Sequence, residues 1–396
     1  MLSKRAEALK PSPTLAINAK EKALKAQGLD IAGFGAGEPD FDTPEHIKQA
    51  AIKAINDNFT RYTPAAGIDP LKDAVIEKFK RDNGLTYKRD EIIISCGGKH
   101  ALFNLFEAIF QEGDEVLIPV PFWVSYPPMV ELTGAKPVLV ETEEKEDYQV
   151  TGSLLKKYIN SKTKGIILNY PSNPAGSVYY RENLEKIGRL AVENNLYIIS
   201  DEIYEKLTYD DYRHISIASL DKSFKDRTII CHGVSKTYAM TGWRIGYAAG
   251  PAHVIKAMSN IQSQSTSNPT SISQMAAIAA LNGPQDIIPI MVNEFKKRRD
   301  FIISELRSIE GVTCYKPKGA FYAFPNFNAI LGKRYKDKTI ESSATLTEIL
   351  LEDFHTAVVP GAEFGKEGYI RLSFATSMDV IKKGLERIKK AVREFR

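Results

Sequence analysis

The sequence predicts an α/β fold in which a large domain is built on a mostly parallel seven-stranded sheet and a second, smaller domain follows it. Two observations support this prediction. Between about residues 45 and 285, short apolar and β-branched runs alternate with helical patterns, which is typical of a parallel sheet covered by helices. After residue 285 this alternation stops, and a long amphipathic stretch leads into a region with fewer strand-like runs.

The strands of the large sheet are predicted from seven short runs of mostly apolar residues. Most of these runs show no strict apolar-polar alternation, as expected for strands that are buried on both faces. In chain order they cover residues 92–94, 116–118, 138–140, 165–168, 197–199, 228–230 and 245–248.

The smaller domain is predicted from the last quarter of the chain. A helix is expected between Pro284 and Ser308, where apolar residues recur near helical spacing. Two strands are expected at residues 321–324 and 369–373, and a final helix is expected to begin at Met378. The sequence shows no fixed-period repeat, which excludes solenoids and propellers.

Composition and charge narrow the class of protein. The chain has 396 residues, enough for about two or three domains. Its 53 basic and 49 acidic residues give a net charge of +4, which is too small to indicate a nucleic-acid or membrane partner. Its three cysteines, Cys96, Cys231 and Cys314, are widely spaced, and no apolar run approaches the roughly 20 residues that span a bilayer. We therefore expect a cytoplasmic enzyme.

The most informative residue is Lys236, which follows the apolar run 228–234 and Ser235. In open α/β sheets, ligands bind where parallel strands end. A lysine among apolar groups or near another cation has a lowered pKa, which favours the neutral amine that forms a Schiff base with an aldehyde. Ser235 and Arg244 would then suit a phosphate. A lone Ser-Lys pair is also compatible with a surface lysine in a loop.

Three polar residues follow successive predicted strands: Asn173, Asp201 and Lys236. Because parallel strands end at one edge of a sheet, these side chains are expected to converge. Considered singly, Asp201 could be a helix N-cap and Asn173 part of a turn. Together with Arg244 they indicate a pyridinium site, where an acid protonates the ring nitrogen and where Asn173 and Tyr204 can contact the phenolic oxygen.

The other end of such a ligand would need phosphate donors, and the loop Ser95 to Lys99 lies between a predicted strand and a helix. Backbone amides at a helix N-terminus bind anions, which assigns this role to Gly97 and Gly98. Trp123 follows another strand end and can lie against a ring or pack in the core. The sequence contains no Walker A loop, dinucleotide fingerprint, metal-spaced histidines or Ser-His-Asp order that would compete.

These motifs resemble those of fold-type I, pyridoxal-phosphate-dependent class I aminotransferases, and among them the bacterial aspartate and prephenate aminotransferases. The likeness runs along nearly the whole chain. It implies a large domain at residues 43–284, a small α+β domain formed by residues 1–42 and 285–396, and a homodimer. The motifs are GEPDFDTP at 37–44, YTPAAG at 62–67, GGK at 97–99, NPAG at 173–176, SDEIY at 200–204, SK at 235–236 with GWR at 242–244, and RLS at 371–373.

The resemblance implies pyridoxal 5'-phosphate as the cofactor. Lys236 would hold the cofactor covalently and act as general acid-base, while Asp201 would pair with the pyridine nitrogen. Tyr204 and Asn173 would contact the 3'-oxygen, and Trp123 would lie on the ring face. The phosphate ligands would be Ser235, Arg244, Gly97, Gly98, the backbone of Lys99, and Tyr62 from the partner subunit.

The resemblance also implies a substrate site. Arg371 would bind the α-carboxylate in a bidentate pair, and Gly37 would contact the substrate through its backbone. Residues 257–295 contain no lysine or arginine, which leaves the side chain of Lys99 as the cation for a second carboxylate. The remaining substrate contacts would come from Trp123 and Asn173, and from Lys10 and Thr14 in the segment KPSPT.

The function implied by the resemblance is transfer of the amino group of L-aspartate to 2-oxoglutarate, giving oxaloacetate and L-glutamate. The KPSPT segment also makes dual activity with prephenate, giving arogenate, an expectation. An aromatic, branched-chain or alanine aminotransferase is the alternative within the class. A pyridoxal-phosphate-dependent lyase or synthase would share most of the site, whereas a cofactor-binding regulator would need a DNA-binding extension.

Overall fold

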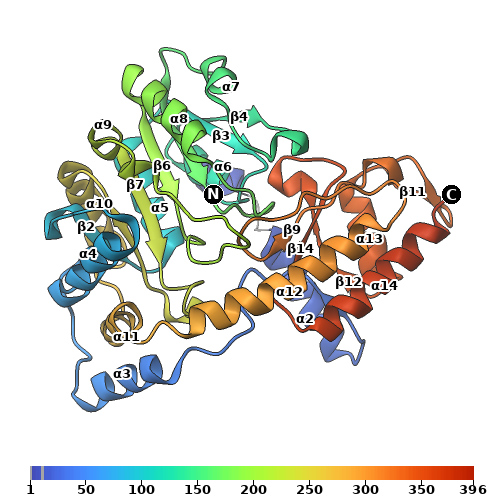
Figure 1. The fold of residues 1–396 in the computed structure, drawn as a ribbon, viewed down its shortest axis with the longest axis horizontal. Helices are drawn as coiled ribbons and strands as arrows, with labels where there is room; N and C mark the ends of the chain where they lie inside the picture. Colours follow the sequence, from blue (N-terminus) through green and yellow to red (C-terminus); the bar gives the residue numbers. More distant parts are fainter. Residues whose placement is uncertain (1, 10–12) are drawn as a thin grey trace.

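Figure 1 shows the computed structural model of the chain, which describes residues 2–9 and 13–396. A larger part, on the left in this view, contains the strands of the central sheet. A smaller part on the right contains the C-terminal helices. The helix α12 (Ile287–Arg307) runs from one part to the other.

The larger part is built on a seven-stranded sheet. Strands β4, β3, β5, β6 and β7 are parallel neighbours, whereas β8 runs antiparallel to both β7 and β2. The predicted mostly parallel sheet and all seven predicted strands are therefore confirmed. In spatial order the strands are β2 (Ile92–Ser95), β8 (Gly246–Ala249), β7 (Thr228–Gly233), β6 (Tyr197–Asp201), β5 (Thr163–Asn169), β3 (Glu115–Val120) and β4 (Lys136–Glu141).

Helices cover both faces of this sheet because alternate strand residues point to opposite sides. Ile93 packs toward α5 (Gly98–Ile109) and α10 (Ala252–Ser265), with α6 (Tyr126–Leu132) on the same face. Ile92 and Ile94 pack on the other face against residues of α4 and α11. That face is covered by α4 (Asp69–Asn83), α11 (Ser271–Asn282), α7 (Gly152–Lys156), α8 (Arg181–Glu193) and α9 (Lys222–Lys225), and α3 (Glu45–Asn56) packs on α11.

The smaller part has a three-stranded antiparallel sheet in the order β13-β14-β9. The expected helix before residue 308, both expected strands and the helix from Met378 are present in the structure. The sequence did not predict the other strands, which are two residues long and carry no periodic pattern. The elements are β9 (Tyr322–Ala323), β10 (Arg334–Tyr335), β11 (Lys338–Thr339), α13 (Ser343–Glu352), β12 (Thr356–Ala357), β13 (Val359–Pro360), β14 (Ile370–Ser373) and α14 (Met378–Glu394).

The N-terminal segment joins this smaller part after α1 (Lys4–Ala8) and α2 (Pro13–Ala26). Strand β1 (Ala32–Gly33) pairs in parallel with β12, and the amide of Ser373 donates to the carbonyl of Phe34 at 2.9 Å. Phe34 is fully buried among side chains of the C-terminal region. On this basis we propose the domain division implied by the resemblance, 43–284 and 1–42 with 285–396.

Among the described residues, no single helix has the length and apolar character of a membrane span, and only α11 and α12 together have them, as a pair bent by 81°. Helix α11 is packed between α3 and α4.

The close contact between Gly384 of α14 and Phe34 predicts that a larger side chain at position 384 lowers the stability of the fold. A Cβ atom added at Gly384 would lie 2.2 Å from Cε2 of Phe34, a ring that is fully buried. Although alanine favours a helix interior by about 1 kcal/mol, Gly384→Ala should lower the free energy of unfolding by about 1–3 kcal/mol. Urea unfolding measures this change. The exposed α14 variant Lys390→Ala is the control and should stay within about 0.5 kcal/mol of wild type.

Candidate active site

A cavity of about 350 Å³ lies at the C-terminal edge of the parallel strands, between the two parts of the molecule. The segment 35–38 and strand β14 close it from the side of the smaller part. Most of the residues predicted for the site line this one cavity. They are Gly37, Gly98, Lys99, Trp123, Asn173, Asp201, Tyr204, Ser235, Lys236, Arg244 and Arg371, and they are joined by Gly35, Ala36, Glu38, Leu102, Tyr126, Asn169, Ile203, Thr241 and Tyr322.

Four predicted site residues are not among the residues lining the cavity. Gly97 adjoins Gly98 and lies directly against the Arg244 guanidinium. Tyr62 is 91% exposed and is not brought to this chain's cavity. Lys10 lies outside the described residues, and Thr14 belongs to α2, with its side chain outside the described part.

Asp201 is the last residue of β6, because the strand extends beyond the predicted run 197–199, and it is only 6% exposed. Its Oδ2 accepts a hydrogen bond from the Tyr126 hydroxyl at 2.6 Å, and Oδ1 accepts from the amide of Ile203 at 3.3 Å. Burial raises the pKa of Asp201 to about 6, although the Tyr126 hydroxyl opposes the shift. The segment after it is a turn rather than a helix, so the N-cap interpretation of Asp201 is wrong.

Lys236 lies in the turn that follows β7, and its Nζ donates a hydrogen bond to the carbonyl of Gly37. Burial lowers the pKa of Lys236 to about 8, and the Arg244 and Arg371 charges act in the same direction. The carboxylates of Glu38 and Asp201 oppose this shift. A substantial fraction of the amine is therefore neutral near pH 8, as a nucleophilic lysine requires.

The loop before α5 forms a narrow cradle. Gly97 has φ +98°, and a Cβ there would lie 2.3 Å from Nη2 of Arg244. On the other side, a Cβ at Gly246 would lie 2.2 Å from the amide nitrogen of Gly98, so only glycine lets β8 approach the N-terminus of α5. Ser235 is buried nearby. Amides at a helix start, a hydroxyl and a guanidinium together form a suitable site for a phosphate.

Arg371 brings a buried guanidinium from β14 to the opposite side of the cavity. Its Nη1 donates to Oδ1 of Asn173 at 3.0 Å, and its Nη2 donates to the carbonyl of Gly35 at 2.9 Å. Its Nε is buried without a hydrogen-bond partner among the described residues. The guanidinium lies 4.7 Å from the ring centroid of Tyr322 and 5.1 Å from that of Phe364, which holds it in one orientation.

Lys99 extends into the cavity, with Nζ 5.0 Å from the ring centroid of Trp123. Partial burial lowers the pKa of Lys99, and the charge of Arg244 adds to this effect. The side chain still reaches solvent through the open cavity. Lys99 and Trp123 thus lie together at the cavity wall rather than in separate environments.

Several residues of the cavity were not predicted from the sequence. Tyr126 and Tyr322 are single tyrosines outside any motif, although Tyr322 hydrogen-bonds through its hydroxyl to Tyr204 at 2.9 Å. Asn169 ends β5, accepts from the amide of Asn173 at 2.9 Å and donates to the carbonyl of Asp201 at 3.1 Å. Asn169 could have been predicted as a site residue from its position at the end of a strand, since the same kind of position identified Asp201.

Comparison with known proteins agrees with this geometry. Residues 30–388 match the model of the family described as aminotransferase class I and II. The chain belongs to this aminotransferase family. Aminotransferases of this kind move an amino group between an amino acid and a 2-oxo acid. The cavity with its lysine, acid and arginine is therefore the candidate active site of an aminotransferase.

Individual relatives of this aminotransferase match it end to end. An aspartate aminotransferase from a Bacillus species is 50% identical over 394 residues, covering 99% of each chain. A probable aspartate/prephenate aminotransferase of Rickettsia conorii is 49% identical over 394 residues, covering 99% of this chain and 98% of the relative. The crystal structure of the aspartate aminotransferase from Rhizobium meliloti superposes with a TM-score of 0.96 at 42% identity, covering 100% of both chains.

The raised pKa of Asp201 predicts how stability depends on pH. In the folded protein without ligand the carboxylate resists ionisation, so stability falls as the pH rises from the ordinary value of 3.8 to about 6. Asp201→Asn lacks this charge and should be more stable than wild type by about 3 kcal/mol at pH 7.5, but by only about 1 kcal/mol at pH 4.5. Urea unfolding at both pH values measures the difference.

The control for this experiment is Asp337→Asn, which changes an exposed aspartate and should give the same difference at both pH values. If Asp201→Asn were less stable than wild type at pH 7.5, the carboxylate would be a structural element rather than a strained functional acid.

Proposed function

We propose that the protein is an aspartate aminotransferase, which transfers the amino group of L-aspartate to 2-oxoglutarate and yields oxaloacetate and L-glutamate. The observation that carries this proposal is the convergence of Lys236, Asp201 and Arg371 on one cavity. The names of the relatives at about half identity over the full length support the same substrate class. An aromatic, branched-chain or alanine aminotransferase and a lyase remain the alternatives that the experiments below address.

Pyridoxal 5'-phosphate is the cofactor in this proposal, and the residues present fit it. The cradle formed by Gly97, Gly98, Ser235 and Arg244 would hold the phosphate. Asp201, with its raised pKa, would hold a proton on the ring nitrogen. When bound, the cofactor supplies an aldehyde for amine exchange and a ring that withdraws electrons from the substrate Cα.

The side chains then have separate tasks. Nζ of Lys236 takes the proton that leaves the substrate Cα and returns a proton to the product, which its lowered pKa permits near neutral pH. Asn173 and Tyr204 orient the ring through its hydroxyl oxygen. The carbonyl of Gly37, which accepts from Lys236 in this structure, lies in the segment 35–38 at the wall of the cavity. Closure of the smaller part over a bound substrate would exclude water.

The two ends of a dicarboxylic substrate would bind two different cations. Nε of Arg371 has no hydrogen-bond partner in the described part of the chain, and its planar guanidinium lies beside two aromatic rings, which suits a bidentate pair with the α-carboxylate. Lys99 lines the same cavity and would bind the second carboxylate. Prephenate also carries two carboxylates, so we propose that it is accepted and converted to arogenate, with Lys10 and Thr14 beside it.

The proposal includes a homodimer in the cytoplasm. Tyr62 is 91% exposed although it is aromatic, which is consistent with a side chain that completes the phosphate site of a partner subunit. The three cysteines are free thiols, as expected in a reducing compartment.

The first functional prediction concerns Lys236. Lys236→Ala should abolish transamination, because no other amine among the described residues of the cavity combines burial with a position beside Asp201. Cofactor should still bind noncovalently, since the phosphate cradle is unchanged. Keto-acid formation with aspartate and 2-oxoglutarate measures activity, and equilibrium dialysis measures binding. Lys256→Ala, an exposed lysine of α10 outside this cavity, should keep wild-type activity, and an active Lys236→Ala enzyme would refute the assignment.

The second functional prediction concerns Lys99. Once the smaller part has closed over a bound substrate, a charge-assisted contact would contribute roughly 1.5 to 3 kcal/mol, so Lys99→Ala should lower kcat/KM for aspartate by about ten- to a hundred-fold. The amino donors alanine and phenylalanine make no such contact, so kcat/KM for them should change little in this variant. The value of kcat/KM for prephenate should fall together with that for aspartate. Steady-state kinetics over this panel of donors gives the answer. Equal losses for aspartate and alanine would assign Lys99 to the phosphate cradle instead.

A further inference from the structure

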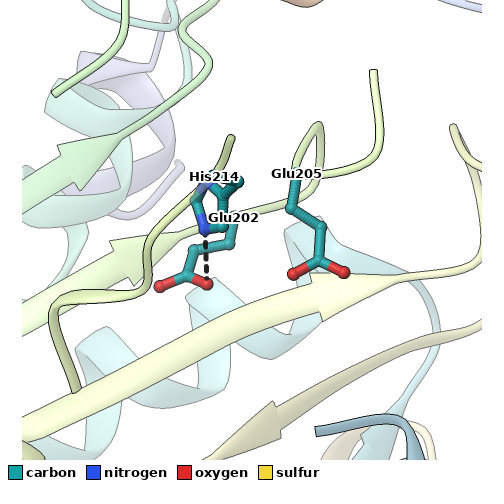
Figure 2. Close-up of side chains that lie close together, drawn as sticks. All are labelled: Glu202, Glu205 and His214. Carbon is teal, nitrogen blue, oxygen red and sulfur yellow. Dashed lines mark hydrogen bonds and ion pairs between the residues drawn. The ribbon is translucent and has the colours of Figure 1, made fainter. Parts of the chain in front are cut away.

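The segment 201–205 presents its side chains to two different environments. Asp201, Ile203 and Tyr204 line the cavity. Glu202 and Glu205 do not line it. Figure 2 shows that they lie close to His214. Both glutamates are at most 4% exposed. The aminotransferase chemistry described above uses neither of them, so their retention in the interior calls for a physical explanation.

Glu202 is held rigidly. Its Oε1 accepts hydrogen bonds from the hydroxyls of Ser200 and Ser216, both at 2.7 Å, and its Oε2 lies 2.9 Å from Nε2 of His214. The amide of Glu202 also donates to the carbonyl of Cys231 on β7 at 3.0 Å. Burial by itself would raise the pKa of Glu202, but His214 and the hydroxyl of Ser216 outweigh it and hold the pKa below its usual value.

The negative charge of Glu205, by contrast, is neutralised by a neighbouring cation. Nζ of Lys78 lies 2.5 Å from its Oε1, and both side chains are at most 3% exposed. Burial lowers the pKa of the neighbouring His232. The ligand atoms of Glu202, Glu205 and His214 lie within 4.8 Å of one another, as at a metal site, but the Lys78 ammonium already provides the cation at Glu205.

Glu202 differs from Glu205 because no lysine or arginine among the described residues pairs with it. Its ion-pair partner is His214, at 2.9 Å, which neutralises the carboxylate only when the imidazole is protonated. It lies directly behind Asp201 in the chain and on the side away from the cavity. On the cavity side, the charge of Lys236 and the Tyr126 hydroxyl both make Asp201 a weaker base. The other titratable neighbours of Asp201 are Tyr204 and Cys231. Those of Glu202 are Glu205, His232, Cys231, Tyr170, Tyr87 and Tyr212.

We infer that Glu202 is a positioning residue, whose fixed negative charge behind Asp201 offsets the cations of the cavity and lets Asp201 keep a proton on the ring nitrogen of a bound cofactor. This inference rests on the proposed function, because it requires a pyridine nitrogen opposite Asp201. Ser200, Ser216 and His214 keep the charge in place. The neutral Lys78–Glu205 pair contributes packing but no net charge.

The test is Glu202→Gln in the holoenzyme loaded with pyridoxal 5'-phosphate that carries ¹⁵N in its ring. Glutamine keeps the size of the side chain and one oxygen that can accept from Ser200 and Ser216, removes the charge, and places an amide NH2, which donates, opposite His214. The ring ¹⁵N chemical shift reports directly whether the nitrogen is protonated. In the variant, the pH at which this proton is lost should fall by about one unit or more, the size of one buried charge acting over several Å. The value of kcat should fall about tenfold or more, with little change in KM.

Two further variants separate charge from packing. Glu202→Asp shifts the carboxylate away from His214 but keeps the charge, so the ring should stay protonated as in wild type even if the melting temperature drops. It also keeps the inference testable if Glu202→Gln fails to fold. The double variant Lys78→Met with Glu205→Gln removes a buried ion pair without changing the net charge, and its ¹⁵N titration should match wild type.

The outcomes distinguish this inference from the proposed function. If the wild-type enzyme neither binds the labelled cofactor nor transaminates aspartate, the proposed function fails. If the wild type does both but Glu202→Gln titrates like wild type, or Glu202→Asp loses the proton as readily as Glu202→Gln, Glu202 is only a structural residue and the inference is wrong.

Discussion

The parallel pairing of β5, β6 and β7 is the constraint on which the site depends. Asn169 at the end of β5 is paired with Asp201 at the end of β6, and Asp201 is paired with Cys231 of β7. Strands that run in one direction must end at one edge, so the polar residues at and after these ends meet without long loops. The side-chain amide of Asn169 reinforces this edge, because its nitrogen donates to the carbonyl of Asp201 and its oxygen accepts from the backbone N–H of Asn173.

The site also depends on the burial of its ionisable groups, which shifts their pKa values. It raises the pKa of Asp201 to about 6 and lowers that of Lys236 to about 8, so both groups can exchange protons near neutral pH. Buried ionisable groups are costly, and in this site specific contacts hold them. The Tyr126 hydroxyl contacts Asp201, the carbonyl of Gly37 accepts from Lys236, and aromatic rings flank Arg371.

The sequence predicted the fold well where the elements are long. All seven strands of the large sheet and the two long C-terminal helices are visible as apolar runs or helical periodicities, because burial on one or two faces dictates those patterns. The two-residue strands β1, β12 and β13 left no such pattern. The interpretation of Asp201 as a helix cap could not be rejected from the sequence, since a carboxylate before a polar turn has the same local appearance in both cases.

The same distinction applies to the site. By itself, the sequence determined the order of strands and helices, the family motifs and the strand-end positions of Asp201 and Lys236, because these depend on residues that are neighbours in the chain. Only the tertiary structure decided that Arg371 reaches Asn173 across 198 residues, that Gly246 admits the start of α5, and that Tyr126 and Tyr322 enter the cavity. Those contacts follow from how separate elements pack, and local patterns carry no information about packing between distant segments.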